Sequence, residues 1–159
     1  MIVSQVQEYR LLKVNYESMV DWREATDYLR CSPLFHKYPH YDFIIVKLEH
    51  SDFFARLIFT FVCIIGADEY ALALIQPFDT PVELRRSDHD LHFHCVKAKP
   101  RSKMEFISVC SIIHGTVLVE DFSRHGRDEY IVLDTVDADL FLRMAEKVSR
   151  LPLHSLQHA

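Results

Sequence analysis

The chain has 159 residues, of which 49% are hydrophobic and 26% are charged, as in an ordinary globular domain with a buried core. Its formal net charge of −5 argues against attraction of the whole surface to nucleic acid or to an anionic membrane, and leaves only a local basic patch for such partners. No uncharged apolar run approaches the roughly 18 residues of a membrane span, and the N-terminal sequence MIVSQVQEYR carries no secretory signal. We therefore expect an intracellular protein, nuclear or cytoplasmic, with no membrane partner.

The cysteines and glycines argue against a disulfide-bonded protein and against a nucleotide-binding protein. The four cysteines are scattered without a C-x-x-C pair, which predicts reduced and mostly buried thiols. Only three glycines occur, whereas phosphate-binding loops need several at fixed spacing so that the backbone can approach the phosphates. We therefore predict no nucleotide cofactor, and the sequence indicates no other cofactor.

The first elements are expected to be a strand and a helix. Residues 9–16, YRLLKVNY, are typical of a short strand. Four apolar residues then recur at helical spacing after a potential N-cap serine: Met19, Trp22, Ala25 and Leu29. This pattern predicts an N-terminal helix that Pro33 ends, followed by a proline-punctuated loop, CSPLFHKYPHYD.

From residue 42 the hydrophobic period becomes two. The segments DFIIVKLE and DFFARLIFTFVCII predict two strands, and GADE predicts a turn into YALALIQPF, which completes a β-hairpin. The longer strand is apolar on both faces, so it is expected near the centre of a sheet or barrel. One of its faces is expected to carry Phe53, Ala55, Leu57, Phe59, Phe61, Cys63 and Ile65.

The rest of the chain predicts short strands and a final helix. Strands are expected in LHFHCVKA, MEFISVCSII, TVLVE and YIVLDTV. The helix ADLFLRMAEKVSRL has Asp137 as its N-cap, and its buried side is expected to carry Leu140, Phe141, Met144 and Val148. The predicted fold is α+β: a β-rich, barrel-like twisted sheet with an N-terminal helix and a C-terminal helix. Residues 1–151 are expected to form this single domain, and residues 152–159 a loose tail.

A candidate metal site lies in the stretch RRSDHDLHFHCVKAKPRSK. His92 and His94 share one face of a strand and could bind one zinc ion, with His89 or a distant residue as a third ligand. The spacing matches no recurrent zinc motif, and exposed or half-buried polar side chains on a barrel face account for it. We therefore predict no metal.

The same stretch contains a basic strip, which consists of Arg85, Arg86, Lys97, Lys99 and Arg101. Clustered cations can contact the phosphates of nucleic acid. A solvated edge strand is the alternative, because lysines at a sheet edge discourage unwanted strand pairing.

An aromatic loop, PLFHKYPHYDF, adds Phe35, Tyr38 and Tyr41 to the predicted binding surface. Aromatic loops can form cages for cationic groups or stack bases, although such rings more often fold onto the core. We expect this loop to lie beside the basic strip or opposite it.

An enzymatic alternative rests on carboxylates. Asp134, Asp137 and Asp139, with Glu120 or Asp121 nearby, could bind Mg²⁺ and support phosphodiester cleavage. Two of these aspartates also suit the cap and the first turn of the C-terminal helix. No Ser-His-Asp or Cys-His arrangement stands out, and we predict no catalytic residue.

Several segments resemble a region found in uncharacterised proteins of mushroom-forming fungi. These segments are DWREATDYLRCSPLFHKYPHYDFIIV, FFARLIFTFVC, YALALIQPFD, DLHFHCVKAKPR, EFISVCSIIHGTVLVEDF and EYIVLDTVDADLFLR. The resemblance covers most of the chain, roughly from Val14 to Arg143. In that family the region often lies near the C-terminal end of transposon-associated proteins, including those of the Kyakuja–Dileera–Zisupton class. The resemblance implies a family but no known chemistry.

The family pattern includes part of the basic strip. The residues of this chain that match the pattern are Asp88, Asp90, Leu91, Val96, Lys99, Pro100 and Arg101. The positions of His89, His92 and His94 depart from it. The resemblance therefore points to the cations rather than to the histidines.

The order of segments is also similar to that of bromo-adjacent homology domains, which have a β-rich core. The similar segments are ARLIF, QPFDTP, ISVCSIIHGTVLV and YIVLDTVDADLFLR. Phe78 follows Pro77 here, whereas the aromatic residue of that family precedes the proline, so a histone-reading cage is not carried over. Fold analogy alone does not give function.

These observations predict a non-catalytic interaction module of a transposon-derived fungal protein, which binds chromatin, protein or nucleic acid through the basic strip. A metal-dependent phosphodiesterase is the enzymatic alternative. A dimerisation or docking domain is the structural alternative, since apolar residues of the N-terminal segment could mediate contact between chains.

Overall fold

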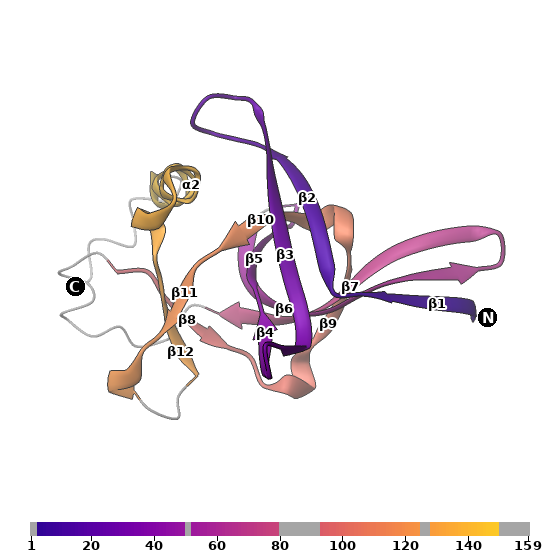
Figure 1. Cartoon of the computed structure of the whole chain (residues 1–159). Helices are drawn as coiled ribbons and strands as arrows, with labels where there is room; N and C mark the ends of the chain where they lie inside the picture. The colour runs from indigo at the N-terminus through magenta and orange to yellow at the C-terminus, as the bar shows by residue number, and fades with distance from the viewer. Residues whose placement is uncertain (1–2, 50–51, 80–92, 125–127, 150–159) are drawn as a thin grey trace.

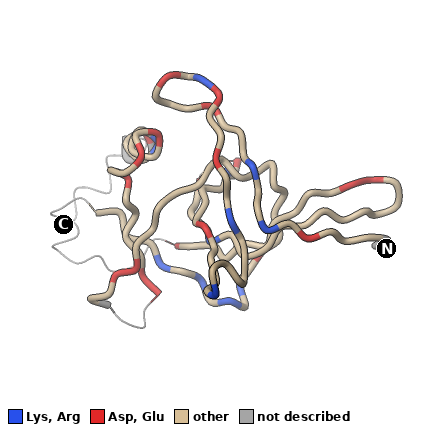
Figure 2. Tube along the Cα trace, in the orientation of Figure 1, with Lys and Arg blue, Asp and Glu red and all other residues tan. Residues whose placement is uncertain are grey.

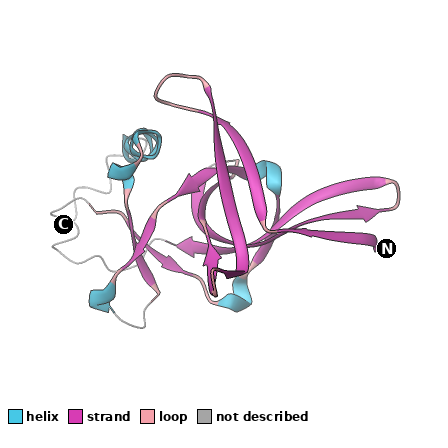
Figure 3. Ribbon diagram, viewed as in Figure 1, coloured by secondary structure: helices cyan, strands magenta, loops and turns pink. Residues whose placement is uncertain are grey.

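The computed structural model describes residues 3–49, 52–79, 93–124 and 128–149. Most of this chain forms two β-sheets, and one α-helix lies near its C-terminal end (Figure 1, Figure 3). The strands are β1 (Val3–Tyr9), β2 (Leu11–Glu17), β3 (Glu24–Phe35), β4 (Tyr38–Tyr41), β5 (Phe43–Lys47), β6 (Asp52–Ile65), β7 (Asp68–Asp79), β8 (Cys95–Ala98), β9 (Glu105–Ser108), β10 (Ile112–Thr116), β11 (Leu118–Glu120) and β12 (Glu129–Val132). The helices are α2 (Ala138–Ser149) and the short 3-10 helices η1 (Arg101–Lys103), η2 (Val109–Ser111), η3 (Phe122–Arg124) and η4 (Asp134–Val136).

The larger sheet is built around one long hairpin. Its strand order is β10-β5-β6-β7-β8-β12-β11, while β1 and β9 pair with parts of β6 and β7. β6 pairs with β5 along its first half and with β1 along its second half, and β7 accompanies it from Ala55 to Ile65. The predicted hairpin and the central position of the long apolar strand are therefore confirmed.

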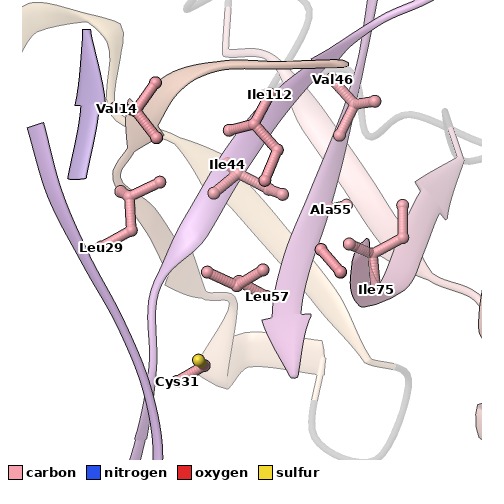
Figure 4. Close-up of a cluster of buried hydrophobic side chains, with 10 residues drawn as sticks. Val14, Leu29, Cys31, Ile44, Val46, Ala55, Leu57, Ile75 and Ile112 are labelled. Carbon is pink, nitrogen blue, oxygen red and sulfur yellow. The ribbon is translucent and has the colours of Figure 1, made fainter. Parts of the chain in front are cut away.

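Two hydrophobic cores cover opposite faces of β5, β6 and β7. The first core lies under the smaller sheet, β2-β3-β4, where Leu57 and Ile44 meet Leu29 (Figure 4). The second core contains Phe54 and Phe78 together with side chains of β8, β11, β12 and α2. Coverage on both faces explains why these strands are nearly continuous apolar runs.

An irregularity in β6 corrects the predicted alternation of its faces. The register between β6 and β7 shifts between Leu57 and Phe59, as in a β-bulge. Thr60 is therefore buried on the side of Leu57, and its hydroxyl lies 3.5 Å from the Cys31 thiol at the edge of the first core. Phe59 turns to the opposite face and is only half-buried.

The larger sheet is strongly curled, but no strand pairing closes it into a barrel within the described ranges (Figure 1). β10 stands at one end of the strand order and β11 at the other, and only Val117 separates these two strands in the chain. Because β10 leads directly into β11, the two edge strands of the larger sheet lie close together, although no strand pairing joins them.

The predicted N-terminal helix is wrong, because residues 24–35 form β3. This strand pairs with β2 from Leu11–Arg30 to Glu17–Glu24, and its buried residues alternate with exposed ones. The residues before it form a turn, in which Trp22 has a left-handed φ of 59° and is exposed. The apolar spacing resembled a helix by coincidence, and cross-strand pairing with β2 overrode it.

The predicted loop over residues 31–42 is also wrong. β3 continues through Pro33 to Phe35, and β4 returns antiparallel beside it. The register is irregular between Ser32 and Phe35, which accommodates a proline without a ladder hydrogen bond. His36 and Lys37 have φ values of 49° and 77°, the left-handed pair typical of a tight two-residue hairpin turn.

The C-terminal helix is confirmed. The Asp139 backbone N–H donates to Asp137 Oδ1 over 2.9 Å, so Asp137 is the N-cap, as predicted. Leu140 and Met144 are buried in the second core. Phe141, which the helical pattern places beside them, is 51% exposed instead. The predicted tail, 152–159, and the side chain of Val148 lie outside the described part of the structure.

Candidate functional site

The basic strip is only partly described, because Arg85 and Arg86 fall outside the described ranges. Lys97 is exposed on β8, and Arg101 is exposed in η1; Figure 2 shows the charged positions along the trace. Lys99 is half-buried, and its Nζ lies 3.3 Å from Asp79 Oδ1.

Within the described part of the strip, acidic residues flank Lys97 on both neighbouring strands. Lys97 is the cross-strand neighbour of Asp79 on β7 and of Glu129 on β12. Opposite charges that face each other across a sheet reduce the local positive potential. This part of the strip is therefore less cationic than the sequence suggests.

The predicted aromatic residues do not form one cage. Phe35 and Tyr38 are cross-strand neighbours at the exposed end of the β3–β4 hairpin. The ring centroids of Phe35 and His40 are 5.3 Å apart, and the Arg30 guanidinium carbon lies 5.3 Å from the Phe35 centroid. Tyr41 instead packs against the first core. The three residues thus divide between an exposed hairpin tip and the interior.

The predicted histidine cluster is mostly outside the described residues, which include His94 but neither His89 nor His92. Within the described ranges, no group of three or more His, Cys, Asp or Glu side chains could hold a metal ion.

The three aspartates of the enzymatic alternative have separate positions. Asp137 caps α2, whereas Asp139 is buried and accepts a hydrogen bond from the Met19 backbone N–H over 2.9 Å. Asp134 belongs to η4, and Glu120 lies on β11. Capping and packing account for the two helix aspartates, and no convergent metal site arises from the described carboxylates.

Sequence reasoning missed a box of aromatic rings around Arg56. The Arg56 guanidinium carbon lies 5.2 Å from the Phe43 ring, 5.9 Å from Phe78 and 5.4 Å from Tyr130. These rings also pack on one another, with centroid separations of 5.2–5.9 Å. Each ring face attracts the cation by about 0.5–2 kcal/mol, more where water is excluded.

Two polar side chains fix the orientation of the guanidinium. Arg56 Nη2 donates to the Tyr130 hydroxyl over 2.6 Å, and Nη1 donates to Gln76 Oε1 over 3.4 Å. Gln76 in turn donates from Nε2 to the Lys99 carbonyl over 2.7 Å. The box therefore joins β5, β6, β7 and β12, and Gln76 links it to the backbone just after β8.

A second missed cluster joins the β2–β3 hairpin to α2. His114 is fully buried on β10 between two carboxylates: Nδ1 lies 3.9 Å from Asp27 Oδ2, and Nε2 lies 3.9 Å from Asp139 Oδ2. Its Nδ1 hydrogen-bonds the Gly115 carbonyl, and because a carbonyl only accepts, Nδ1 carries a proton. The Tyr16 ring stacks on the imidazole at 4.7 Å.

Arg143 completes this cluster from the next turn of α2. Its Nε lies 3.3 Å from Asp139 Oδ2, and its Nη2 donates to the Glu17 carbonyl over 3.0 Å. Asp27 accepts a hydrogen bond from the Gly115 backbone N–H over 2.8 Å. We call these residues the latch cluster: Tyr16, Asp27, His114, Asp139 and Arg143.

The latch cluster holds Tyr16 in its neutral form. Burial, together with the carboxylates of Asp27, Asp137 and Asp139, raises the pKa of Tyr16 from its ordinary value of 10.0 to about 12, while the Arg143 guanidinium opposes the rise. The neutral phenol is thus favoured in the folded protein.

Stability is therefore expected to fall in alkaline solution. Because the folded pKa is above the unfolded one, the contribution of Tyr16 is complete below pH 10.0 and is lost as the pH rises through about 12. The free energy of unfolding, measured with urea near neutral pH and at several pH values between 10 and 12, should fall more steeply with pH for the wild type than for Tyr16→Phe. Tyr28→Phe, which changes an exposed tyrosine of β3, is the control and should behave as the wild type. Equal slopes for all three proteins would contradict the assignment.

A third feature is an uncovered apolar face on the arm that β1 and the ends of β6 and β7 form (Figure 1). Cross-strand pairing aligns Val6, Cys63 and Tyr70 in one row, and the bulge at Ile58 brings Phe59 onto the same face. We call this the outer face, and its large side chains are Val6, Phe59, Phe61, Tyr70, Leu72, Leu74 and Phe106. Val6, Tyr70 and Phe106 are among the exposed large hydrophobic residues.

One sequence signal was available for this face. The alternation of Phe59, Phe61 and Cys63 predicts an apolar face, but it places these residues on the side of Leu57 because a bulge has no clear mark in this sequence. No comparable signal existed for the aromatic box or for the latch cluster, which assemble from distant strands.

Comparisons with known proteins give no further guide. No helix in the described ranges is long and apolar enough to cross a membrane. No family model, no curated protein and no solved structure matches the chain, so its resemblance to transposon-associated fungal proteins stays a prediction.

Proposed function

We propose that this domain is a non-catalytic interaction module whose main contact surface is the arm, and that the arm pairs with a second copy of the chain. One observation carries this proposal: an apolar, partly aromatic sheet face continues to a strand whose far edge has no partner among the described residues. Contiguous exposed apolar surface of this kind is typical of interaction sites.

The free edge of β1 favours a strand as the contacting element. β1 pairs with β6 only, and it contains neither proline nor lysine, the residues that commonly protect an edge from pairing. Its register irregularity is confined to Val3–Gln5, so Gln5 to Tyr9 is regular. An edge left in this condition can accept a further strand through backbone hydrogen bonds.

A second copy of β1 fits this edge. An antiparallel pair centred on Val6 places the two Val6 side chains together and each Gln5 opposite Gln7 of the other copy. The two Glu8 carboxylates are then separated along the strands, so no like charges face each other. Such a two-fold contact would join two arms into one continuous sheet and extend the outer face across it.

Self-association is therefore expected to depend on Val6. The wild type should shift from monomer towards dimer as its concentration rises in sedimentation velocity runs. Val6→Lys places two cations together on the two-fold axis and should weaken association at least tenfold, or about 1.4 kcal/mol. Val20→Lys is the matched control, because Val20 is 55% exposed on the β2–β3 turn and Val6 is 57% exposed on the arm.

Two outcomes would overturn this proposal. A wild-type protein that stays monomeric at every accessible concentration would remove the second copy as the partner. Equal association of both lysine variants would place the contact elsewhere on the surface.

The basic strip is a second candidate surface, for chromatin or nucleic acid. The observation in its favour is that two of its cations, Lys97 on β8 and Arg101 in η1, are exposed. Charge reversal at Lys97 and Arg101 should then abolish binding to duplex DNA and flatten its salt dependence. Unchanged binding would identify the strip as a solvated edge.

A further inference from the structure

Among the described residues, the aromatic box brings no negative charge to Arg56. The other half-buried cations with assigned partners have carboxylates: Lys99 pairs with Asp79, and Arg143 pairs with Asp139. Across the described ranges, no carboxylate forms an ion pair with Arg56. Ring faces and two neutral oxygens attract the guanidinium, but they do not cancel its charge.

Arg56 also has unused hydrogen-bond donors. A guanidinium has five N–H groups, and the described chain supplies acceptors only to Nη1 and Nη2. Nε has no acceptor there, and it is not among the fully buried polar atoms that lack a partner. Arg56 is half-buried as a residue, so these donors are held at the edge of solvent rather than sealed inside.

Tyr130 offers a further donor at the same place. Its hydroxyl oxygen accepts the bond from Arg56 Nη2, which leaves the hydroxyl hydrogen to donate. Gln76 Oε1 already accepts from Arg56 Nη1, and one N–H of Gln76 Nε2 donates to the Lys99 carbonyl. The polar groups that remain free around the guanidinium are thus donors, and they suit an anion.

The aromatic box and the outer face lie on the same side of the β6–β7 hairpin. Arg56 is paired with Gln76, and beyond the bulge the next pair on that face is Phe59 with Leu74, which belongs to the outer face. A cationic ligand is disfavoured, because Arg56 itself occupies the space between the rings. A group that reaches Arg56 meets donors at one end and apolar side chains at the other.

We propose that Arg56 and Tyr130 bind an oxyanion, the carboxylate or phosphate group of a ligand. The rings hold the guanidinium in a fixed orientation before the ligand arrives, which lowers the entropic cost of binding. Guanidinium groups suit both oxyanions because their N–H donors lie in a planar fork. This site does not depend on self-association, since no β1 residue takes part in it.

The test is an NMR titration of the arginine Nε–H signals. Nitrogen-15-labelled full-length protein is titrated with sodium acetate and, separately, with inorganic phosphate, against sodium chloride at matched ionic strength. The Arg56 signal, identified by its loss in Arg56→Lys, should move saturably with at least one oxyanion. The signal of Arg30 is the internal control, because Arg30 stacks on a single ring, Phe35, on an exposed strand surface. Comparison of acetate with phosphate shows which oxyanion the site prefers.

Tyr130→Phe keeps the ring and removes the hydroxyl donor, so it guards against a fold defect in the lysine variant. Tyr130→Phe should raise the dissociation constant of the oxyanion about threefold, as expected for the loss of one hydrogen bond. The thermal unfolding midpoint of this variant should change little. An Arg56 signal that moves no more than with chloride, or no more than the Arg30 signal, would overturn the proposal. Unchanged oxyanion affinity in Tyr130→Phe would exclude Tyr130 from the site and contradict the two-residue proposal.

Discussion

Replacing Asp139 by alanine is expected to lower the free energy of unfolding by about 3 kcal/mol or more. Asp139 is only 3% exposed. Its carboxylate accepts a hydrogen bond from the Met19 backbone N–H, forms an ion pair with Arg143 and lies 3.9 Å from His114 Nε2. Its removal leaves the partly buried Arg143 guanidinium without its carboxylate and the Met19 backbone N–H without an acceptor. Equilibrium unfolding in urea, followed by far-ultraviolet circular dichroism, measures the change.

Two further variants separate charge from hydrogen bonding. Asp139→Asn keeps an oxygen for the Met19 N–H but loses the charge, so it should fall between the wild type and the alanine variant. Glu105→Ala removes an exposed carboxylate from β9 and should change stability by less than about 0.5 kcal/mol. If Asp139→Ala lost less than about 1 kcal/mol, α2 would not be fastened to the β2–β3 hairpin through this carboxylate.

Leu57→Ala is expected to destabilise the protein by about 3 kcal/mol. Leu57 is fully buried in the first core, between the strands of the long hairpin and the smaller sheet (Figure 4). The substitution removes apolar contacts and leaves a cavity that a core bounded by two sheets cannot easily collapse. The same urea unfolding experiment measures the loss.

The matched control for this core variant is Leu34→Ala. Leu34 is exposed near the end of β3, so its truncation should cost less than about 0.5 kcal/mol. Similar losses for the two leucines would mean that the two sheets do not pack around Leu57 as the structure shows.

Much of the fold was accessible from local sequence patterns. The alternation of DFFARLIFTFVCII and the turn after it led to the central hairpin, and Asp137 marked the start of the last helix. These signals are local: side-chain period, turn residues and a cap lie within a few positions of one another.

The errors came from interactions between distant segments. Residues 24–35 carried an apparent helical period, but pairing with β2 on one edge and with β4 on the other made them a strand. The bulge after Leu57 reverses the faces of β6, so Phe59 lies on the outer face and not on the side of Leu57, where the alternation places it. Neither effect follows from the composition of the segment alone.

The functional groups were the least predictable part. The basic strip was visible because its cations are close in sequence, yet Asp79 and Glu129 reach it from other strands. Arg56 gave no local signal, because Phe43, Phe78 and Tyr130 come from three other strands. The fully buried His114 likewise meets its two aspartates only in the fold.

The most direct test of the proposed interaction surface is residue-resolved hydrogen exchange of β1 at low and high protein concentration. In the isolated chain, the β1 amides that point away from β6 have no strand partner among the described residues, so they should exchange rapidly. Edge pairing between two copies predicts that these outward amides gain protection as concentration rises, while amides of the exposed β2–β3 turn do not. Exchange of the outward β1 amides that is independent of concentration, in a sample whose mass does increase, would contradict pairing through this edge.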